Sequence, residues 1–471
     1  MKRPNILLLY TDQQRWDAIG ANDNTEIITP NLDALAARGV NFMRCFVQNP
    51  VCMPSRVSML SGRYPSSLGI THMGVPVPED IMTLPRILKL AGYRTANIGK
   101  LHFLPHANRD HRLPHPSYGF DHLEIADEPG VYEDAYRAWV RRQAPEQMDE
   151  ISAGIPPNTR VWQRAMGIED DVAHRGNPEG RFDFDGGIAF GADDGLTHSA
   201  FVGERTSEFI RSSGDEPFFC IAGFYSPHAP WISPGKFLDL YDDSTLSLPH
   251  YPVEVDQGRP NDPIAQFSDA QLRRAKRGYY AMISELDHCV GRILAVLDSC
   301  GKADDTIVVF TSDHGEWLGD HLRYGKGYPA DDCVSRVPLI FDAPDGQSGQ
   351  VCYDIVEAVD IAPTLLELAG VQIPPFIQGE SLAGIIEGGA ERQKNIAITE
   401  GAGWKCLRTS QCRYLIHADG REMLWDLHAD PGEYHDVSDQ EEYESALAEC
   451  RQILLKRLLE IERPLQRSWT Y

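Results

Sequence analysis

Long hydrophobic runs are missing from this sequence, and so are clusters of basic residues. The apolar stretch nearest the N-terminus, residues 6–10, lies between Asn5 and Asp12 and has no small-residue cleavage site after it. It is too short for a membrane span or for the core of a signal peptide. We therefore expect a buried strand there, no membrane partner, and a cytoplasmic location.

The chain is also poor in positive charge, with 44 Lys and Arg against 69 Asp and Glu and a net charge of −25. A chain of this charge repels nucleic acid and anionic lipid, which excludes both as partners. Its 10 cysteines show no C-x-x-C spacing, so we expect reduced thiols and neither a disulfide framework nor a zinc site.

Strand and helix patterns alternate over most of the chain. The apolar runs at 5–11, 217–225 and 305–313 are typical of strands that are covered on both faces. Amphipathic patterns predict helices at 29–39, 83–93, 269–297 and 359–370. This alternation predicts an α/β domain over residues 1–390, with a large, mostly parallel sheet and helices on both faces.

Two segments break the alternation. Residues 104–200 are rich in Pro, Gly, His and acidic residues, and we expect an insertion over the sheet edge that forms a pocket wall. Residues 391–471 show short strands with tight turns and then a helical pattern at 440–462. They predict a small α+β domain with an antiparallel sheet.

The stretch NPVCMPSRVSMLSGRYP, residues 49–65, places a cysteine at the start of a predicted helix. Pro54 suits a first helical position and Gly62 a helix end. Cys52 would then lie near the positive end of the helix dipole, with Arg56 one turn on. Such surroundings suit a nucleophile, or one made from the thiol. The alternative is a half-buried cysteine at a helix cap with no chemical role.

Three predicted strands end in polar residues, namely Asp12-Gln13, the segment with His228, and Asp313-His314. The carboxyl ends of parallel strands meet at one sheet edge, where ligands bind. Two acidic strand ends, each followed by a second donor, suit one divalent cation. Taken singly, each aspartate could instead cap a helix.

The segment from Cys52 to Arg63, with its C-x-P-S-R start and Gly-Arg end, resembles the signature of the sulfatase family. Other segments extend the resemblance over nearly the whole chain: PNILLLYTDQQ (4–14), IGKLHF (98–103), TSDHGEWLGDH (311–321), YGKG (324–327) and LWDLHADPGEYHDV (424–437). The resemblance implies an alkaline-phosphatase-like fold, one divalent metal ion, and hydrolysis of small-molecule sulfate monoesters.

The resemblance also implies that a formylglycine-generating enzyme converts Cys52 to formylglycine during maturation. The hydrated aldehyde has two hydroxyl groups, so that one can attack sulfur and the other can expel sulfate. A serine would lack the second group. The implied metal ligands are Asp12, Gln13, Asp313, His314 and residue 52. Calcium is the expected ion, with manganese and magnesium as contenders because His314 adds a nitrogen donor; whether Gln13 binds metal or substrate stays open.

Further roles follow from the same resemblance. Arg56 would hold the hydrated residue 52, and Lys100 and Lys326 would neutralise the sulfate oxygens. His102 would be the base, and His228, which also binds substrate, would be the acid. Two expectations concern other histidines. His72 could reach the sulfate, and His106, His111 and His115 lie in a solvated loop, although their density also permits a substrate rim.

Two other functions compete with sulfate ester hydrolysis. One is a phosphonate monoester or phosphodiester hydrolase of the same superfamily; Lys100-x-His102 favours the sulfatases. The other is a non-catalytic anion-binding protein in which Cys52 stays a thiol, which intact-protein mass would reveal. The oligomeric state cannot be deduced, although the terminal LQRSWTY at 465–471 could dock on a second copy.

Overall fold

The computed structural model describes residues 3–106, 109–152, 187–259, 267–389 and 394–462, together with residues 154, 161, 165 and 167. The predicted domain boundary at 390/391, the terminal segment 465–471 and much of the insertion lie outside the described residues. The boundary therefore stays a prediction, and so does docking of the terminal segment on a second copy.

The larger sheet has eight strands among the described residues, in the order β10-β2-β9-β8-β1-β6-β3-β4. Their bounds are β1 Asn5–Thr11, β2 Val40–Phe46, β3 Arg94–Gly99, β4 His122–Ile125, β6 Phe218–Gly223, β8 Thr306–Ser312, β9 Arg336–Asp342 and β10 Gln350–Glu357. Strand β9 runs against its neighbours β2 and β8, and every other neighbouring pair is parallel. The predicted mostly parallel sheet is confirmed.

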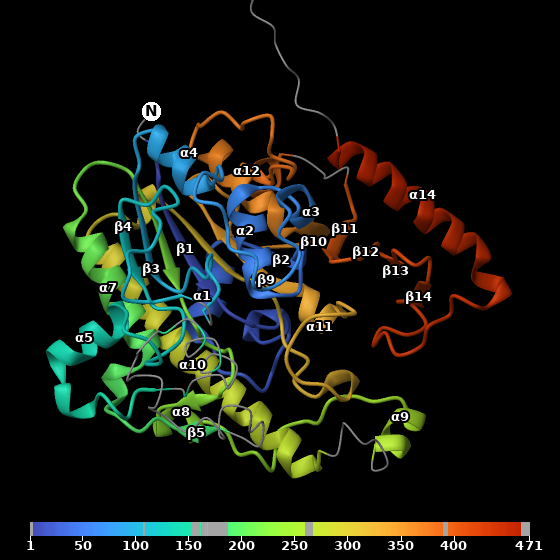
Figure 1. Cartoon of the computed structure of the whole chain (residues 1–471), viewed down its shortest axis with the longest axis horizontal. Helices are drawn as coiled ribbons and strands as arrows, with labels where there is room; N and C mark the ends of the chain where they lie inside the picture. The colour runs from blue at the N-terminus through green and yellow to red at the C-terminus, as the bar shows by residue number, and fades with distance from the viewer. Residues whose placement is uncertain are drawn as a thin grey trace, which may run out of the picture.

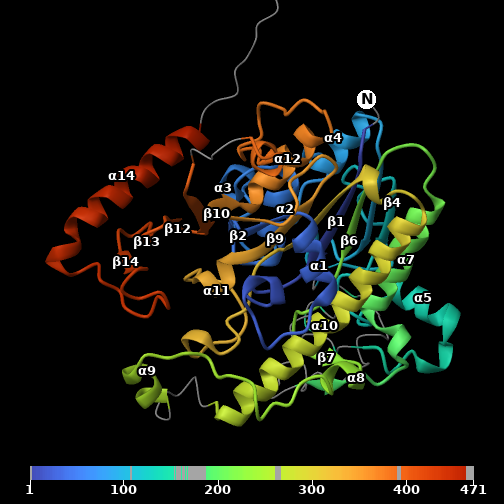
Figure 2. The same ribbon diagram turned by 180° about the vertical axis from the view of Figure 1, so that it is seen from behind.

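Helices cover both faces of this sheet (Figures 1 and 2). The α-helices of the described residues, including those elsewhere in the chain, are α1 Pro30–Arg38, α2 Cys52–Ser61, α3 Pro65–Leu68, α4 Leu84–Leu90, α5 Ala135–Gln143, α7 His198–Ser212, α8 Gly235–Leu238, α9 Val253–Gly258, α10 Asp269–Ser299, α11 Asp332–Ser335, α12 Ile361–Leu368, α13 Ala383–Ile386 and α14 Glu444–Ile461. The small strands β5 Ile188–Ala189 and β7 Ile232–Ser233 pair beside α10.

Strand β1 lies in the middle of the sheet and divides the core in two. Ile6 and Leu8 pack with side chains of α2, α4 and α12, whereas Leu7 and Leu9 pack with side chains of α1, α5, α7 and α10. All four side chains are fully buried. Burial of each contributes about 1.5–3 kcal/mol, which makes this strand a rigid base for the residues that follow it.

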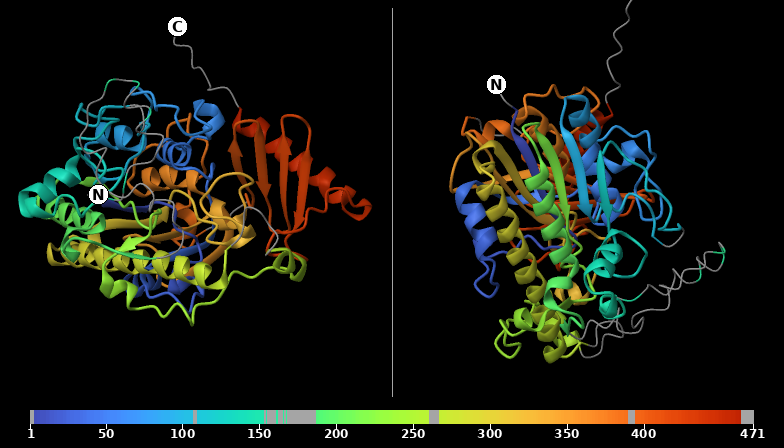
Figure 3. Two further views of the ribbon diagram at one scale, coloured as in Figure 1. Left: turned by 60° about the horizontal axis from the view of Figure 1, so that its bottom comes forward. Right: turned by 90° about the vertical axis from the view of Figure 1, so that its left-hand side faces the viewer.

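The C-terminal part forms a separate antiparallel sheet, β11-β12-β13-β14, with α14 packed against it (Figure 3). The strands are β11 Ala397–Gly401, β12 Trp404–Arg408, β13 Cys412–His417 and β14 Glu422–Asp426. A small antiparallel sheet followed by a helix is what the sequence pattern predicts for this region.

Two further findings bear on the sequence analysis. All 10 cysteines have free thiols, as the absence of paired spacing predicts. In the part of the chain that the structure describes, no helix has the length and apolarity that crossing a bilayer requires.

Candidate active site

Helix α2 presents Cys52 at its first residue. The helix begins at Cys52, so that Pro54 takes its third position and not its first, and ends at Gly62, whose φ of 66° lies in the left-handed region. All ten of its residues are buried, not only one apolar side. The thiol therefore lies directly at the positive end of a buried helix.

Four neighbouring parallel strands deliver the other site residues to one edge of the sheet. In the order β8, β1, β6 and β3, they lead into Asp313, Asp12, the His228 loop and Lys100. Thr11 pairs with Ser312, so Asp12 and Asp313 leave adjacent strand ends together. The predicted gathering of strand ends is thus present, and β3 adds a fourth.

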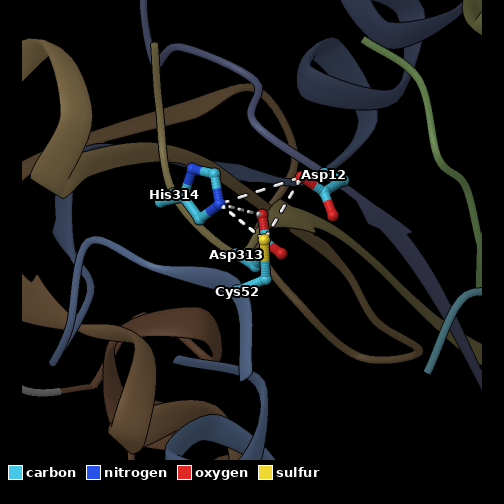
Figure 4. Close-up of side chains that lie close together, drawn as sticks. All are labelled: Asp12, Cys52, Asp313 and His314. Carbon is cyan, nitrogen blue, oxygen red and sulfur yellow. Dashed lines mark hydrogen bonds and ion pairs between the residues drawn. The ribbon is translucent and has the colours of Figure 1, made fainter. Parts of the chain in front are cut away.

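Asp12, Cys52, Asp313 and His314 converge on one point (Figure 4). One potential ligand atom from each lies within 4.8 Å of the others, and all four residues are buried. Cys52 Sγ lies 3.2 Å from His314 Nε2 and 3.8 Å from Asp12 Oδ1. We call these four residues the open cluster.

Three cations surround the open cluster. Arg56 Nε donates to Asp313 Oδ2 over 2.7 Å, and its Nη2 lies 3.5 Å from Asp12 Oδ2. Lys100 Nζ pairs with the same Asp12 oxygen at 2.7 Å. Lys326 Nζ lies 2.7 Å from Cys52 Sγ. A chain of strongly negative net charge thus has a local excess of positive charge at this point, which suits an anionic ligand.

The backbone brings Lys100 close to the cluster through two glycines. Lys100 N donates to the Gly223 carbonyl over 2.7 Å, and a Cβ on Gly223 would lie 2.2 Å from the Lys100 carbonyl oxygen. A Cβ on Gly99 would likewise lie 2.1 Å from the Gly223 carbonyl oxygen. Since a side chain at either position would clash with backbone, β3 and β6 can approach this closely only with glycine at both.

These surroundings shift the pKa values of the cluster. Although burial acts against its charge, Lys100 and Lys326 hold the pKa of Asp12 well below its usual range. Burial and the Asp12 carboxylate raise the pKa of the Cys52 thiol to about 12. Burial and Asp12 thus disfavour a thiolate at Cys52, and the alternative from the sequence analysis, a nucleophile made from the thiol, stays a prediction.

The donor set of the open cluster fits a divalent cation. His314 Nδ1 lies 2.9 Å from the Gly315 carbonyl oxygen, so Nδ1 carries the proton and the Nε2 lone pair faces the carboxylates. Gln13 is buried, its Nε2 donates to Glu316, and its Oε1 has no hydrogen-bond partner. Two carboxylates, one imidazole nitrogen and an unpartnered amide oxygen are ligands that such ions accept.

The predicted histidines occupy different environments. His102 is buried, with a φ of 54° and neither ring nitrogen hydrogen-bonded. His228 is half-buried, and its Nδ1 lies 2.6 Å from the Ala229 carbonyl oxygen, which leaves Nε2 free to meet a ligand. His72 is exposed, with its Nδ1 on the Met73 carbonyl, and no hydrogen bond or ion pair joins it to the open cluster.

The three histidines expected in a solvated loop, His106, His111 and His115, are half-buried. The His106 ring stacks on His102 with centroids 3.9 Å apart, and the His111 ring stacks on Tyr132 at 3.6 Å. The loop is thus less solvated than its polar composition suggests, because ring faces cover one another, and the alternative of a substrate rim stays a prediction.

Three supporting residues were not foreseen. Glu316 accepts hydrogen bonds from the side chain of Gln13 and the backbone of Gly325, and Tyr225 lies under Lys100 with its ring centroid 4.8 Å from Nζ. Asp127 accepts from the backbone N–H groups of Leu101 and His102, each over 2.9 Å. Only Glu316 gave a signal, since it lies two residues after a predicted ligand.

Comparison with known proteins agrees with this geometry. The sulfatase family model matches residues 4–371, and that of the N-sulphoglucosamine sulphohydrolase C-terminal region matches residues 319–460. An arylsulfatase of Clostridium perfringens is 30% identical over 97% of this chain and 94% of its own. The multifunctional alkaline phosphatase superfamily protein PehA of Trinickia caryophylli is 26% identical over 99% of this chain and 97% of its own.

A solved structure shares the whole fold. The phosphonate monoester hydrolase of Agrobacterium radiobacter superposes with a TM-score of 0.80 and 24% identity, over 98% of this chain and 96% of the other. The predicted alkaline-phosphatase-like architecture is thereby confirmed. The chain belongs to the sulfatase family and is a sulfuric ester hydrolase of the alkaline phosphatase superfamily.

Proposed function

We propose that this enzyme hydrolyses sulfate monoesters with residue 52 as its nucleophile, after oxidation of Cys52 to formylglycine. The observation that carries the proposal is the position of Cys52. It is the first residue of a buried helix, its Sγ lies 2.7 Å from Lys326 Nζ and 3.2 Å from His314 Nε2, and Arg56 and Lys100 lie behind it. Hydrated formylglycine supplies two hydroxyl groups on one carbon, one for attack and one for release of sulfate.

One divalent cation would be held by Asp12, Asp313, His314 and the side chain of residue 52, with Gln13 Oε1 as a further donor. When bound, the ion would act as a Lewis acid on the sulfate ester and make an adjacent hydroxyl more acidic. Calcium suits the oxygen donors, and the His314 nitrogen keeps manganese and magnesium as alternatives.

Arg56 is proposed to orient the carboxylates. Its Nε donates to Asp313, its Nη1 to the Lys100 carbonyl over 3.3 Å and its Nη2 to the Thr11 carbonyl over 3.2 Å. Because these hydrogen bonds use most of the Arg56 donors, Arg56 would hold the strand ends in register. It would also face residue 52. The expected direct hold on the hydrated side chain is secondary to this role.

Lys100 and Lys326 would bind the sulfate group from two sides. Burial acts against both charges, but the neighbouring Asp12 and Cys52 raise the pKa of each lysine, so both stay protonated. As S–O bond cleavage spreads negative charge over the sulfate oxygens, two fixed cations stabilise that charge without reorganisation.

His228 and His102 would move the protons. In the substrate-free site, burial and Lys326 hold the pKa of His228 well below its usual range. A sulfate ester between the lysines adds negative charge and raises that pKa, which lets His228 give a proton to the leaving oxygen. His102, whose ring nitrogens have no partner, would accept the proton that residue 52 loses when sulfate departs.

The test compares the wild type with Cys52→Ser and Cys52→Ala on 4-nitrophenyl sulfate, with peptide mass analysis at residue 52. Wild type should show the aldehyde or its hydrate and steady turnover. The serine variant keeps one hydroxyl, so it should become sulfated once and stall. The alanine variant should show neither turnover nor adduct. Equal turnover by wild type with an unmodified thiol would contradict the proposal.

The same assay with a phenyl phosphonate monoester decides the second candidate function. It is favoured by the fold shared with a phosphonate monoester hydrolase and by the relative described as multifunctional. Against it, Lys100 and His102 occupy places that we associate with uncharged hydroxyl residues in that branch. A kcat/KM higher for the phosphonate than for the sulfate would favour it over sulfate hydrolysis. Co-expression with and without a formylglycine-generating enzyme tests that maturation partner.

A further inference from the structure

Cys412 and Cys450 lie in contact in the C-terminal part of the chain, and neither has a role in the proposed chemistry. Cys412 is the first residue of β13, and Cys450 lies within α14. Cys450 belongs to the apolar core between the antiparallel sheet and α14, and Cys412 packs against that core. The Cys412 side chain is half-buried, whereas Cys450 is 4% exposed. The pair therefore spans the contact between the sheet and its helix, with one thiol partly open to solvent.

The alternation of side chains along β13 places Cys412 on the face that α14 covers. Neighbouring residues of a strand point to opposite faces of the sheet. Cys412, Tyr414 and Ile416 pack in the core that contains the α14 side chains. Leu415 packs with Trp425 on the other face. The Cys412 thiol therefore points toward α14 and not into the opposite face of the sheet.

A carboxylate fixes β13 against α14 at the level of this pair. Glu422 accepts hydrogen bonds from the Tyr414 hydroxyl and from Arg451 Nε, the second over 2.7 Å. Tyr414 is the next residue after Cys412 on the same face of β13, and Arg451 follows Cys450 on α14. The two cysteine side chains meet between these partners, where a hydrogen bond joins one thiol to the other.

The two thiols differ in acidity. The hydrogen bond from Cys450 lowers the pKa of Cys412, and the charge of Arg408 acts in the same direction, although burial and the Asp426 carboxylate oppose it. The same hydrogen bond, together with burial, raises the pKa of Cys450. A thiol is oxidised through its thiolate. Cys412 is therefore the thiol that an oxidant attacks, and Cys450 is the neighbour that can complete a disulfide.

We propose that Cys412 and Cys450 form a reversible disulfide between β13 and α14 when the protein meets a hydroperoxide. The Cys412 thiolate attacks the O–O bond of hydrogen peroxide, which leaves a sulfenic acid on Cys412 and releases one water. The Cys450 sulfur then attacks the Cys412 sulfur, the S–S bond forms, and the hydroxyl group leaves as a second water with the Cys450 proton. Each sulfur loses one electron, and the peroxide takes up both. Exchange with a small dithiol restores the two thiols.

The disulfide would fasten the part of the chain that holds Lys326. Arg413, the residue after Cys412, pairs with Asp331 at 2.8 Å, and Asp331 follows Lys326 by a few residues. Lys326 Nζ in turn lies 2.7 Å from Cys52 Sγ. Detachment of α14 from β13 would loosen this anchor, and the disulfide would oppose it. The inference concerns the C-terminal sheet, so it holds whether or not the enzyme cleaves sulfate esters.

The experiment treats the reduced full-length chain with hydrogen peroxide, blocks the remaining thiols by alkylation and analyses the digested protein by mass spectrometry. A pair of peptides linked through residues 412 and 450 should appear, with the mass of two hydrogens lost, and dithiothreitol should separate them. Cys412→Ala should prevent the link. Cys450→Ala should leave a sulfenic acid at Cys412, which dimedone traps. Cys300→Ala is the matched control and should behave as wild type, because Cys300 is half-buried like Cys412 but lies at the end of α10.

Hydrogen exchange measures what the link does to the fold. The disulfide closes a loop that contains β13, β14 and the start of α14. Because α14 could no longer separate from β13, the α14 amides of oxidised wild type should exchange at least roughly tenfold more slowly than those of reduced wild type. Peroxide should leave the exchange of Cys412→Ala unchanged.

The opposite results would overturn the inference. Oxidation of Cys412 to a sulfinic or sulfonic acid with no link to Cys450, or oxidation of Cys300 ahead of Cys412, would show that the two thiols do not act as a pair. A linked peptide with unchanged α14 exchange would show that the disulfide does not fasten α14 to the sheet. The wild-type and Cys412→Ala results decide the matter even where Cys450→Ala does not fold.

Discussion

Among the residues that the structure describes, two groups of histidine, cysteine and carboxylate side chains have the spacing of a metal site, and they differ in what lies between their ligand atoms. The open cluster is one. The other, His321, Asp331 and Glu433, also has ligand atoms within 4.8 Å of one another. In this second group the carboxylates face a buried guanidinium. Arg413 lies 2.8 Å from Asp331 and 3.0 Å from Glu433. We call it the closed cluster.

The position of the cations explains the difference. Arg413 fills the closed cluster, stacks on Trp425 at 3.6 Å and donates to the Pro329 carbonyl. In the open cluster Arg56 and Lys100 pair with outer carboxylate oxygens, and Lys326 lies 3.8 Å from Asp12 Oδ1, while Asp12 Oδ1, Asp313 Oδ1 and His314 Nε2 still face one another with no guanidinium between them. Ligand spacing alone therefore does not make a metal site, because the charge and lone pairs must also be unused.

The closed cluster connects the C-terminal sheet to the segment that carries Lys326. Arg413 belongs to β13, and Pro329 and Asp331 follow Lys326 by only a few residues. A neighbouring pair, Arg408 of β12 with Asp332 at 2.8 Å, joins the same two segments. The C-terminal sheet thus holds the segment that brings Lys326 to Cys52.

The largest expected effect comes from removing a charge of the open cluster. Asp313→Asn keeps the shape but loses the charge that faces Arg56 and the proposed cation. Activity on 4-nitrophenyl sulfate should fall at least about a thousandfold, by the scale of lost electrostatic stabilisation in active sites. A chelator should do the same to wild type, with recovery on adding calcium, manganese or magnesium.

Thermal unfolding provides the control for that prediction. A cation at a hundredfold excess over its Kd should stabilise wild type by about 2.7 kcal/mol. Asp313→Asn should lose this stabilisation. Full activity in metal-free protein, checked by elemental analysis, would show that the open cluster is no metal site.

Removing the cation of the closed cluster should mainly lower the stability of the fold. Arg413→Met leaves Asp331 and Glu433 buried without their cation, which should lower the free energy of unfolding by about 3–5 kcal/mol. Urea denaturation measures the change. Arg421→Met is the matched control, since Arg421 is 71% exposed and pairs only with exposed Asp419. A loss below about 1 kcal/mol would mean that the pairing contributes nothing net.

Lys326→Met removes the positive charge of Lys326 but leaves the segment that carries this residue in place. We expect kcat to fall roughly a hundred- to a thousandfold with the unfolding free energy nearly unchanged, because Lys326 acts on charge that develops during cleavage. Lys236→Met, at an exposed position that pairs with Asp194, should be neutral. A change confined to KM would instead assign Lys326 to ground-state binding.

The smallest effect should follow His321→Asn in the closed cluster. His321 has a φ of 52°, which asparagine tolerates, and its ring stacks on Tyr434 at 4.4 Å. Stability should change by less than about 1 kcal/mol, and the cation-induced thermal shift should equal that of wild type. A reduced shift would reveal a cation at the closed cluster and show that both clusters bind metal.

The sequence predicts the centre of this fold better than its edges. Strands β1 and β8 are continuous apolar runs, so their ends, and with them Asp12 and Asp313, could be placed from pattern alone. The antiparallel course of β9 has no such signal, because strand direction depends on connections and not on composition. Helix α2 begins at Cys52, as the sequence indicates, but Pro54 occupies its third position and not its first, because proline fits several positions of a first turn.

The residues that the sequence analysis did not identify lie far along the chain from the residues that they contact. Arg413 lies more than 80 residues from Asp331, and Asp127 contacts His102 from the next strand of the sheet. A local window cannot link such residues. Each can be recognised only when the fold places a buried charge beside it.

The strand order also determines how late in synthesis Cys52 can become buried. The neighbours of β1 in the sheet are β6 and β8, and β8 ends at Ser312. Cys52 therefore leaves the ribosome long before the strands that will enclose it exist. At ~5–20 residues per second, roughly 15 to 50 s separate the synthesis of residue 52 from that of Asp313. The finished protein leaves the thiol 1% exposed. The proposed oxidation of Cys52 would therefore have to precede folding, since the folded chain buries the thiol.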